Sequence, residues 1–236
     1  MIANRSVLAV ITARGGSKGL PGKNVADLGG RPLVAWSVAA GKSSRYVDRL
    51  ILSSDDPKII RAARAAGGEA PFRRPARLAT DTIAIYPVLF HALDALNESY
   101  DYIVLLQASS PLRTPEDIDG CIRLCHRAGA PVVSVAPAAK SPQWMFALDS
   151  RHRLRRMSKI RRAADRRQDL PPVYIPNGAV YVARTEWLRK HGSFVGPETR
   201  GYVMPPERSV DIDTRLDLLL ARALVAETSQ SKRRKS

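Results

Sequence analysis

The sequence predicts one α/β domain in which a mostly parallel β-sheet is the middle of three layers and helices cover both of its faces. Apolar, β-branched runs of strand length alternate along the chain with segments whose apolar residues recur at helical spacing. The 236 residues are enough to form one sizeable core, and the 44% hydrophobic content is ordinary for a globular protein. We therefore expect ligands at the carboxyl ends of the strands.

The first half of the chain predicts strand 7–13, helix 32–43, strand 49–54, helix 57–66, strand 69–72, helix 83–98 and strand 102–106. Pro32 would take a first-turn position, where its missing N–H costs little. Asp55 and Asp56 with Pro57 end the second strand and begin the next helix. The run 102–106 is almost continuously apolar, which is typical of a central strand.

The second half predicts helix 115–128, strand 131–136, an insertion at 137–172, strand 177–182 and a last helix from residue 214. Thr114 is the expected N-cap of the first of these helices, and Thr214 with Asp217 forms a capping-box-like pair at the last. The insertion is arginine-rich and has no clear period. We expect the domain to end at residue 227, before a basic, disordered tail at 228–236.

The net charge of +16 makes nucleic-acid binding an alternative to enzymatic function. The arginines are scattered along the chain, however, so a nucleic-acid partner is not expected. Cys121 and Cys125 lack the C-x-x-C spacing of metal or redox sites, and we expect reduced thiols in a cytoplasmic protein. Neither a signal region nor an apolar stretch of membrane-spanning length is found, so secretion and membrane insertion are not expected.

The loop after the first strand combines four glycines with Arg14, Lys18 and Lys23. Glycines let backbone N–H groups approach an anion, and the cations can offset the charge of a nucleotide triphosphate. The loop is not a Walker A motif, because Asn24 follows Lys23, and it lacks the G-x-G-x-x-G of dinucleotide-binding folds. A surface turn with solvated lysines is the structural alternative.

Residues 13–19 together with Lys23 and Asn24 resemble the A-R-G-G-S-K-G-x-x-x-K-N motif of the acylneuraminate cytidylyltransferases, the CMP-sialic acid synthetases. The resemblance implies a Rossmann-like nucleotide-diphospho-sugar transferase fold. In that family the loop wraps the phosphates of CTP. It implies nucleotide binding by Ala13, Arg14, Gly15, Gly16, Ser17, Lys18, Lys23 and Asn24.

Two later segments resemble the same family. Residues 73–82, RRPARLATDT, resemble its R-P-x-x-L-A-x-D-T segment beside the base and ribose, which implies CTP contacts for Arg74 and Thr82. Helix capping is the alternative for residues of this loop such as Thr80. Residues 107–113, QASSPLR, resemble Q-x-[ST]-S-P-L-R, which implies that Gln107 contacts the acceptor sugar; an amide there offers both a donor and an acceptor.

The segment 177–181, NGAVY, matches the family's N-G-A-[IV]-Y strand, which implies that Tyr181 and Phe194 line the sugar pocket. As lone aromatics, both would be core residues. Asp211 and Asp213 lie in a D-I-D-T-x-x-D match that implies a metal site. Carboxylate oxygens suit Mg²⁺, although helix capping alone would explain the acidic pair. The catalytic set implied by the resemblance is Arg14, Lys18, Lys23, Asp211 and Asp213.

The resemblance implies a homodimeric enzyme that transfers CMP from CTP to the anomeric hydroxyl of a nine-carbon acidic sugar and releases pyrophosphate. Its insertion, 137–172 here, would pack into a second subunit. The chain departs from the family where Trp144-Met145 and Ile175 replace commonly basic residues, although Lys140 could compensate. The sugar therefore stays open, and a 3-deoxy-octulosonate enzyme is the nearest alternative, although its acidic Q-G-D-E-P segment is missing here.

Overall fold

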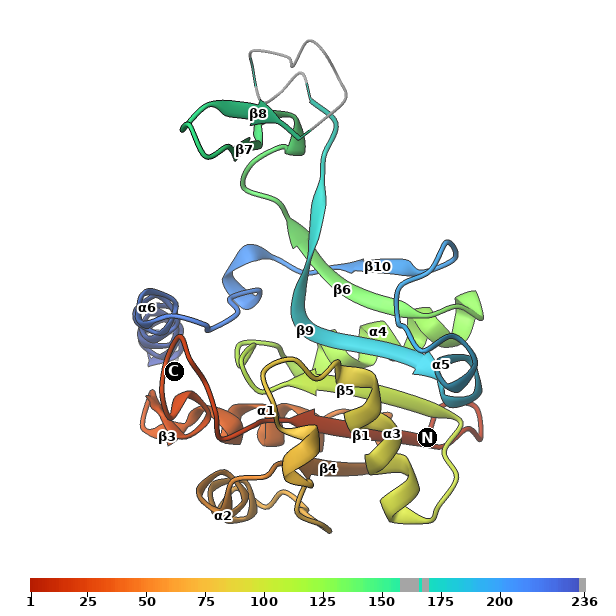
Figure 1. The fold of residues 1–236 in the computed structure, drawn as a ribbon. Helices are drawn as coiled ribbons and strands as arrows, with labels where there is room; N and C mark the ends of the chain where they lie inside the picture. The colour runs from red at the N-terminus through yellow and green to blue at the C-terminus, as the bar shows by residue number, and fades with distance from the viewer. Residues whose placement is uncertain (158–165, 167–169, 234–236) are drawn as a thin grey trace.

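A computed structural model describes residues 1–157, 166 and 170–233. Its main sheet has six strands in the order β10-β6-β9-β5-β1-β4 (Figure 1). These strands are β1 (Val7–Thr12), β4 (Arg49–Ser53), β5 (Tyr102–Gln107), β6 (Val132–Pro137), β9 (Tyr174–Arg184) and β10 (Arg200–Val203). β9 is antiparallel to its neighbours β5 and β6, and the other pairs are parallel. The predicted, mostly parallel sheet is confirmed.

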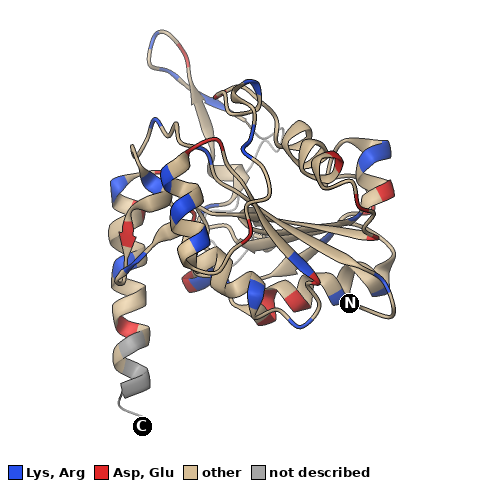
Figure 2. Cartoon of the chain, turned by 90° about the horizontal axis from the view of Figure 1, so that it is seen from below, with Lys and Arg blue, Asp and Glu red and all other residues tan. Residues whose placement is uncertain are grey.

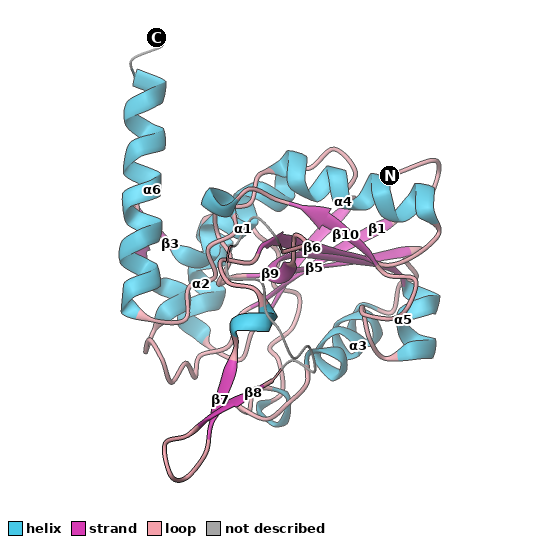
Figure 3. Ribbon diagram, turned by 90° about the horizontal axis from the view of Figure 1, so that it is seen from above, coloured by secondary structure: helices cyan, strands magenta, loops and turns pink. Residues whose placement is uncertain are grey.

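Helices cover both faces of this sheet, which explains why β1 and β5 are almost entirely buried. Val7, Ala9 and Ile11 of β1 belong to the core on one face, with α1, α2 and α4. Leu8 and Val10 belong to the core on the other face, with α3 and α5 (Figures 1 and 3). These helices are α1 (Leu33–Lys42), α2 (Pro57–Ala65), α3 (Ile85–Leu96), α4 (Pro115–Ala128) and α5 (Thr185–His191).

A third, smaller core holds the last helix, α6 (Arg215–Arg233), against the short strand β2 (Asp27–Leu28), which pairs with β3 (Arg31–Pro32). Leu218 and Ala221 of α6 pack there with Leu28 and Leu33. The far end of α6 extends away from the body of the molecule (Figure 3). This packing brings the start of α6 next to the loop that follows β1.

The predicted caps of α2, α4 and α6 are confirmed by their hydrogen bonds. Thr114 caps α4 in a full capping box with Asp117. The Asp56 side chain accepts a hydrogen bond from the Lys58 N–H at the start of α2. Before α6, the Asp217 carboxylate accepts from the Thr214 N–H, and the Thr214 hydroxyl accepts from the Asp217 N–H.

The predicted insertion projects from the sheet as a hairpin, clearly separated from the body in Figure 1. We call residues 141–157 the arm. It contains a 3-10 turn (Pro142–Trp144) and the antiparallel strands β7 (Phe146–Leu148) and β8 (Leu154–Arg156). Most of the remaining insertion, 158–165 and 167–169, lies outside the described residues.

Three sequence predictions are wrong in detail. Residues 69–72 form no strand, because only Glu69 bridges to Ile51. The tail is not disordered through residue 233, because α6 continues to Arg233; residues 234–236 lie outside the described chain. The helix predicted from residue 32 begins one residue later, and Pro32 is its N-cap.

The described chain shows no helix that is long and apolar enough to cross a membrane. Cys121 and Cys125 are free and buried in α4, and burial raises the pKa of both thiols. Lys and Arg alternate with Asp and Glu over many helices and loops (Figure 2). A cytoplasmic location stays a prediction.

Candidate functional site

A cavity of about 490 Å³ opens at the carboxyl ends of β1 and β5, where the fold predicts a ligand site. Thr12 and Gln107, the last residues of these two strands, are in its wall. The predicted site residues that line it are Ala13, Arg14, Gly16, Ser17, Lys18, Lys23, Asn24, Arg74, Gln107 and Asp213. Those outside its lining are Gly15, Thr82, Tyr181, Phe194 and Asp211.

The glycine-rich loop is fixed by hydrogen bonds to its backbone. Asn24 is buried, and its side-chain amide donates to the Arg14 carbonyl at 2.9 Å. The Gly15 N–H donates to the Asp55 carboxylate at 3.1 Å. Gly19 lies against the acidic segment 211–213. A Cβ added at Gly19 would be 2.5 Å from the Asp213 carbonyl oxygen. A glycine is therefore required at residue 19 for these two segments to meet.

All three cations of the loop are paired with carboxylates of the cavity. Arg14 and Lys18 both bind Asp81, at 2.5 and 2.8 Å. Lys23, whose side chain is only 12% exposed, binds Asp213 at 2.8 Å. The cavity thus contains a cluster of alternating charges, with the loop on one side and acidic groups from two other segments around it.

Arg74 is a buried cation at the end of β4. Its guanidinium donates to the Ser53 hydroxyl at 3.1 Å and to the Ser53 carbonyl. Burial lowers the pKa of Arg74 to about 10, and Arg14 adds to this while Asp55 opposes it. Arg74 therefore stays charged at neutral pH. Of the following loop, Thr80 and Asp81 line the cavity, whereas Thr82 does not.

The acidic segment before α6 is extended but belongs to no strand. Ile212 between the two aspartates is fully buried, and its N–H donates to the Ser109 carbonyl at 2.8 Å. Asp213 is largely exposed beside Lys23. Asp211 is more enclosed, and burial raises its pKa; Asp213 adds to this, whereas hydrogen bonds from Ser109 and Ser110 oppose it.

Gly178 brings the predicted sugar and metal residues together. It has a φ of +73°, and a Cβ there would lie 2.7 Å from the Ser110 hydroxyl, 3.1 Å from Gln107 Oε1 and 3.3 Å from Asp211 Oδ2. Gln107 and Asp211 therefore face each other across the space that the missing side chain leaves. Because this backbone conformation strains any other residue, only glycine suits the position.

A network of buried polar side chains holds Gly178 and the acidic segment in place. Asn177 accepts from the Ser134 hydroxyl at 2.6 Å and donates to Ser209 at 2.9 Å. Arg208, next to Ser209, binds the buried Asp117 through two hydrogen bonds of 2.9 and 2.8 Å. The N-terminus of α4 is thereby tied to the segment that carries Asp211.

Gln107 is positioned through its own backbone. Arg113 is 3% exposed and donates to the Gln107 carbonyl, and to Ser37 at 2.7 Å. Burial lowers the pKa of Arg113 to about 9, and Asp211 and Asp117 oppose that shift. The carbonyl at the end of β5 is thus held by a buried cation.

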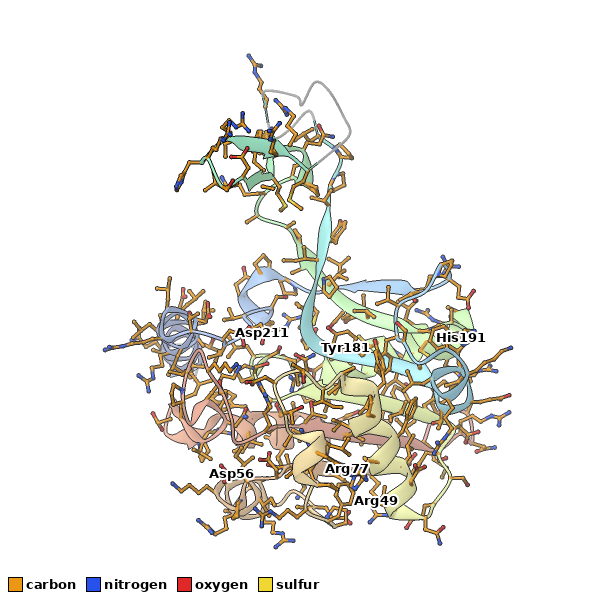
Figure 4. All side chains as sticks on the ribbon, in the orientation of Figure 1. Arg49, Asp56, Arg77, Tyr181, His191 and Asp211 are labelled. Atoms are coloured by element: carbon orange, nitrogen blue, oxygen red, sulfur yellow. The ribbon has the colours of Figure 1, made fainter. Side chains whose placement is uncertain are left out.

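The two predicted sugar aromatics differ in position. Tyr181 is partly buried on β9 and lies between Asp211 and His191 in Figure 4. Burial raises the pKa of Tyr181, and the Asp211 carboxylate adds to this. Phe194 is 1% exposed in the core, with its ring centroid 5.5 Å from that of Tyr181. The structure therefore places Phe194 behind Tyr181 and not in the cavity wall.

Sequence reasoning missed several residues that build the cavity. Asp81 is the main one, although it stands inside the quoted segment RRPARLATDT; a lone acid among basic residues was the available signal. Ser109 is another, and its signal was its position two residues after Gln107. The apolar side of the cavity, which no motif indicated, comprises Ile83, Ala84, Ile85 and Val88.

The acidic pair suits Mg²⁺ better than a fully protein-enclosed metal. Within the described ranges, no group of three or more His, Cys, Asp or Glu residues could hold a metal ion. Asp211 and Asp213 together supply carboxylate oxygens beside the cationic loop. Mg²⁺ keeps several waters and is bound by one or two carboxylates together with substrate phosphates, so this donor set fits it.

Comparisons with known proteins agree with the geometry. A family model described as cytidylyltransferase matches residues 8–188. The chain is 33% identical over 229 residues to CMP-N,N'-diacetyllegionaminic acid synthase of Legionella pneumophila, covering 93% of this chain and 96% of that protein. It is 31% identical over 229 residues to pseudaminic acid cytidylyltransferase of Campylobacter jejuni, covering 95% and 98%.

A solved structure shares the fold. It is CMP:2-keto-3-deoxy-manno-octonic acid synthetase complexed with CTP, with a TM-score of 0.71 and 20% sequence identity. The match covers 94% of this chain and 99% of that one. At 20% identity, this likeness supports the α/β fold alone.

Gly178→Ala should lower the free energy of unfolding by roughly 3 kcal/mol, because the positive φ and the contact with Ser110 both oppose a Cβ. Gly129→Ala is the matched control: its φ is +64° with nothing within 4 Å of the added Cβ, and it should cost roughly 1 kcal/mol. Urea unfolding of both variants measures the difference. Equal losses would mean that the contact around Gly178 is not restrictive.

Asp211→Asn should stabilise the protein in EDTA at pH 7, raising Tm by roughly 2–4 °C. Because the pKa of Asp211 is raised in the folded state, ionised Asp211 lowers the free energy of unfolding at pH values above that pKa. Below the unfolded-state pKa of about 4, the group is protonated in both states and has no effect. The Tm difference should therefore grow as pH rises from 4 to 7. Asp213→Asn, which loses only the pair with Lys23, should not stabilise, and an equal gain there would contradict the burial argument.

Proposed function

The chain belongs to the cytidylyltransferase family, and we propose that it transfers CMP from CTP to the anomeric hydroxyl of a nine-carbon acidic sugar, with release of pyrophosphate. The observation that carries the proposal is the junction of the glycine-rich loop with the acidic segment. At that junction Lys23 binds Asp213, and Gly19 lies against the Asp213 backbone. A cationic loop beside paired carboxylates is what a metal-assisted reaction at a triphosphate requires.

The loop is the proposed triphosphate site. Arg14, Lys18 and Lys23 line one cavity and can each donate to phosphate oxygens. As the bond to the α-phosphorus breaks, negative charge develops on the departing pyrophosphate, and these fixed cations stabilise it. Arg74, buried at the end of β4, is the proposed contact for the base and ribose, and Thr80 replaces Thr82 as the hydroxyl on the cavity wall.

The sugar is proposed to bind where Gln107 faces Asp211 across Gly178. The Gln107 amide can both donate to and accept from sugar hydroxyls, and the pKa of Tyr181 is raised by burial and then by the nearby Asp211 carboxylate. No histidine is found among the described residues that line the cavity, so the carboxylates are the available proton acceptors. Asp211, which borders the same space at Gly178 as Gln107, is the proposed acceptor of the hydroxyl proton.

Asp211 and Asp213 are the proposed ligands of Mg²⁺, consistent with the oxygen donors that they supply. When bound, the metal would neutralise phosphate charge beside the cationic loop. The protein's contribution is to hold the two carboxylates: the buried Ile212 and its hydrogen bond to Ser109 fix their backbone, and Lys23 orients Asp213.

The arm is the proposed dimer contact. Five of its large apolar side chains are exposed, and apolar side chains that gather on one projecting segment mark a protein–protein contact more often than an isolated one does. A second copy of the chain would bury them, as the insertion of the related family implies. The exposed side chains are Met145, Phe146, Leu148, Leu154 and Met157.

The acceptor is proposed to be a nonulosonate of the legionaminate or pseudaminate kind, because enzymes named for these sugars are among the relatives at 31–33% identity. Lys140, near the arm, is the candidate partner of the sugar carboxylate, since Ile175 is apolar and exposed. A 3-deoxy-octulosonate acceptor is supported by the shared fold alone.

Pyrophosphate release with Mg²⁺ should be seen with CTP and not with ATP, GTP or UTP, and with one nine-carbon sugar in preference to 3-deoxy-octulosonate. A coupled phosphate assay over this panel measures it, with N-acetylneuraminate, legionaminate and pseudaminate as the nine-carbon acceptors. Turnover only with 3-deoxy-octulosonate would move the enzyme to the alternative reaction. Binding of CTP without turnover of any acceptor would contradict the acceptor class.

Asp213→Ala and Lys23→Ala should each lower kcat/KM by about a hundredfold or more, because each removes a charge that is fixed beside the reacting phosphates. Asp94→Ala is the control, since Asp94 is an exposed acid paired with Arg189 outside the cavity. Folded variants with full activity would contradict the assignment of the junction as the reaction centre.

Leu148→Asp combined with Leu154→Asp should convert a dimer into a monomer, because the charges would be desolvated in the proposed contact. Light scattering after gel filtration measures the mass. Leu216→Asp is the matched control: Leu216 is 74% exposed on α6 and lies outside the arm. A wild-type monomer, or a double variant that stays dimeric, would exclude the arm as the dimer contact.

A further inference from the structure

Asp81 is a charged residue of the cavity wall for which the proposed reaction provides no role. It stands in the loop between the 3-10 turn Ala76–Leu78 and α3, on a different segment from the cations that it binds. Its two carboxylate oxygens take separate partners: Oδ1 binds Arg14 at 2.5 Å and Oδ2 binds Lys18 at 2.8 Å. One carboxylate therefore holds two of the three cations that are proposed to bind the triphosphate.

The charge of Asp81 lies inside the phosphate site and not behind it. Asp81 itself lines the cavity, together with Arg14 and Lys18. Hydrogen bonds from Lys18 and then Arg14 lower the pKa of Asp81, so it is fully ionised at neutral pH. A triphosphate or pyrophosphate that reaches these cations must approach an anion at the same place.

The ion pairs of Asp81 with Arg14 and Lys18 can also break, so that other groups take the place of Asp81. The Asp81 side chain is 38% exposed and that of Lys18 is 83% exposed, so water can replace either partner at little cost. The other acidic contact of the loop, Asp213 with Lys23, lies at the proposed metal site, where the acid has a function of its own. Asp81 has no such second function in the structure.

We propose that Asp81 is an internal competitor of the phosphates: it binds Arg14 and Lys18 in their place and thereby weakens the hold of the enzyme on CTP and, above all, on the pyrophosphate product. The inference rests on the proposed function. A site with these cations and no competing anion would retain pyrophosphate and favour the reverse reaction. An acid that merely orients the cations would act in the opposite direction, because its loss would weaken phosphate binding.

The test is calorimetric titration of the full-length protein with inorganic pyrophosphate, together with inhibition of the forward reaction by pyrophosphate. Asp81→Asn should bind pyrophosphate about threefold to tenfold more tightly than the wild type, and CTP should tighten in the same direction. The gain should shrink as salt is raised from 50 to 500 mM, because the groups are exposed. Asp81→Ser, a second neutral variant, should behave alike.

Two controls isolate the charge. Asp81→Glu keeps the carboxylate and should leave pyrophosphate affinity within about twofold of the wild type. Asp94→Asn makes the same chemical change in an exposed ion pair outside the cavity and should have no effect. Unchanged or weaker pyrophosphate binding by folded Asp81→Asn and Asp81→Ser would overturn the proposal.

The outcome is separable from that of the proposed function. If wild-type protein turns over CTP and neutral variants bind pyrophosphate no more tightly, the reaction stands and the role of Asp81 is wrong. If wild-type protein turns over no acceptor, the proposed reaction fails, while the pyrophosphate titration still decides whether Asp81 competes for the loop cations.

Discussion

The site depends on one contact between a segment near the start of the chain and a segment near its end. Gly19 of the loop after β1 lies against the backbone of Asp213, and Lys23 of the same loop binds its carboxylate. The contact exists because β1 lies inside the sheet, between β5 and β4, and α6 packs beside β2, which follows that loop. Both halves of the proposed chemistry, cations and carboxylates, are assembled by this packing.

The fold was largely predictable because its strongest elements carry local signals. The continuous apolar runs of β1 and β5 are buried on both faces, and the caps at Thr114 and Asp56 are hydrogen-bonded within a few residues. Residues 69–72 look equally strand-like, but only Glu69 finds a partner, and whether an edge segment pairs depends on its tertiary neighbours. The tail was misjudged by composition, since α6 simply continues.

The site was predictable only where a functional residue follows a recognisable segment. Arg14, Lys23 and Gln107 stand at strand ends or in the glycine-rich loop, and the structure brings them to one cavity. Arg208 acts through Asp117, a partner distant in sequence, so nothing local distinguished it from a solvated surface charge. Phe194 was predicted to line the sugar pocket, but a match to a motif does not determine whether a side chain faces a cavity or the core.

The buried polar groups around the acidic segment show what the positioning costs. Asp117, Asn177 and Ser134 are buried near the core, where apolar side chains would pack at least as well. Paired charges and satisfied amides instead fix direction, because each hydrogen bond restricts the angle as well as the distance. In a site where Gln107 and Asp211 must face each other across the width of one missing side chain, small rotations matter more than added stability. The network therefore trades packing for orientation at the residues that stand next to the proposed reacting groups.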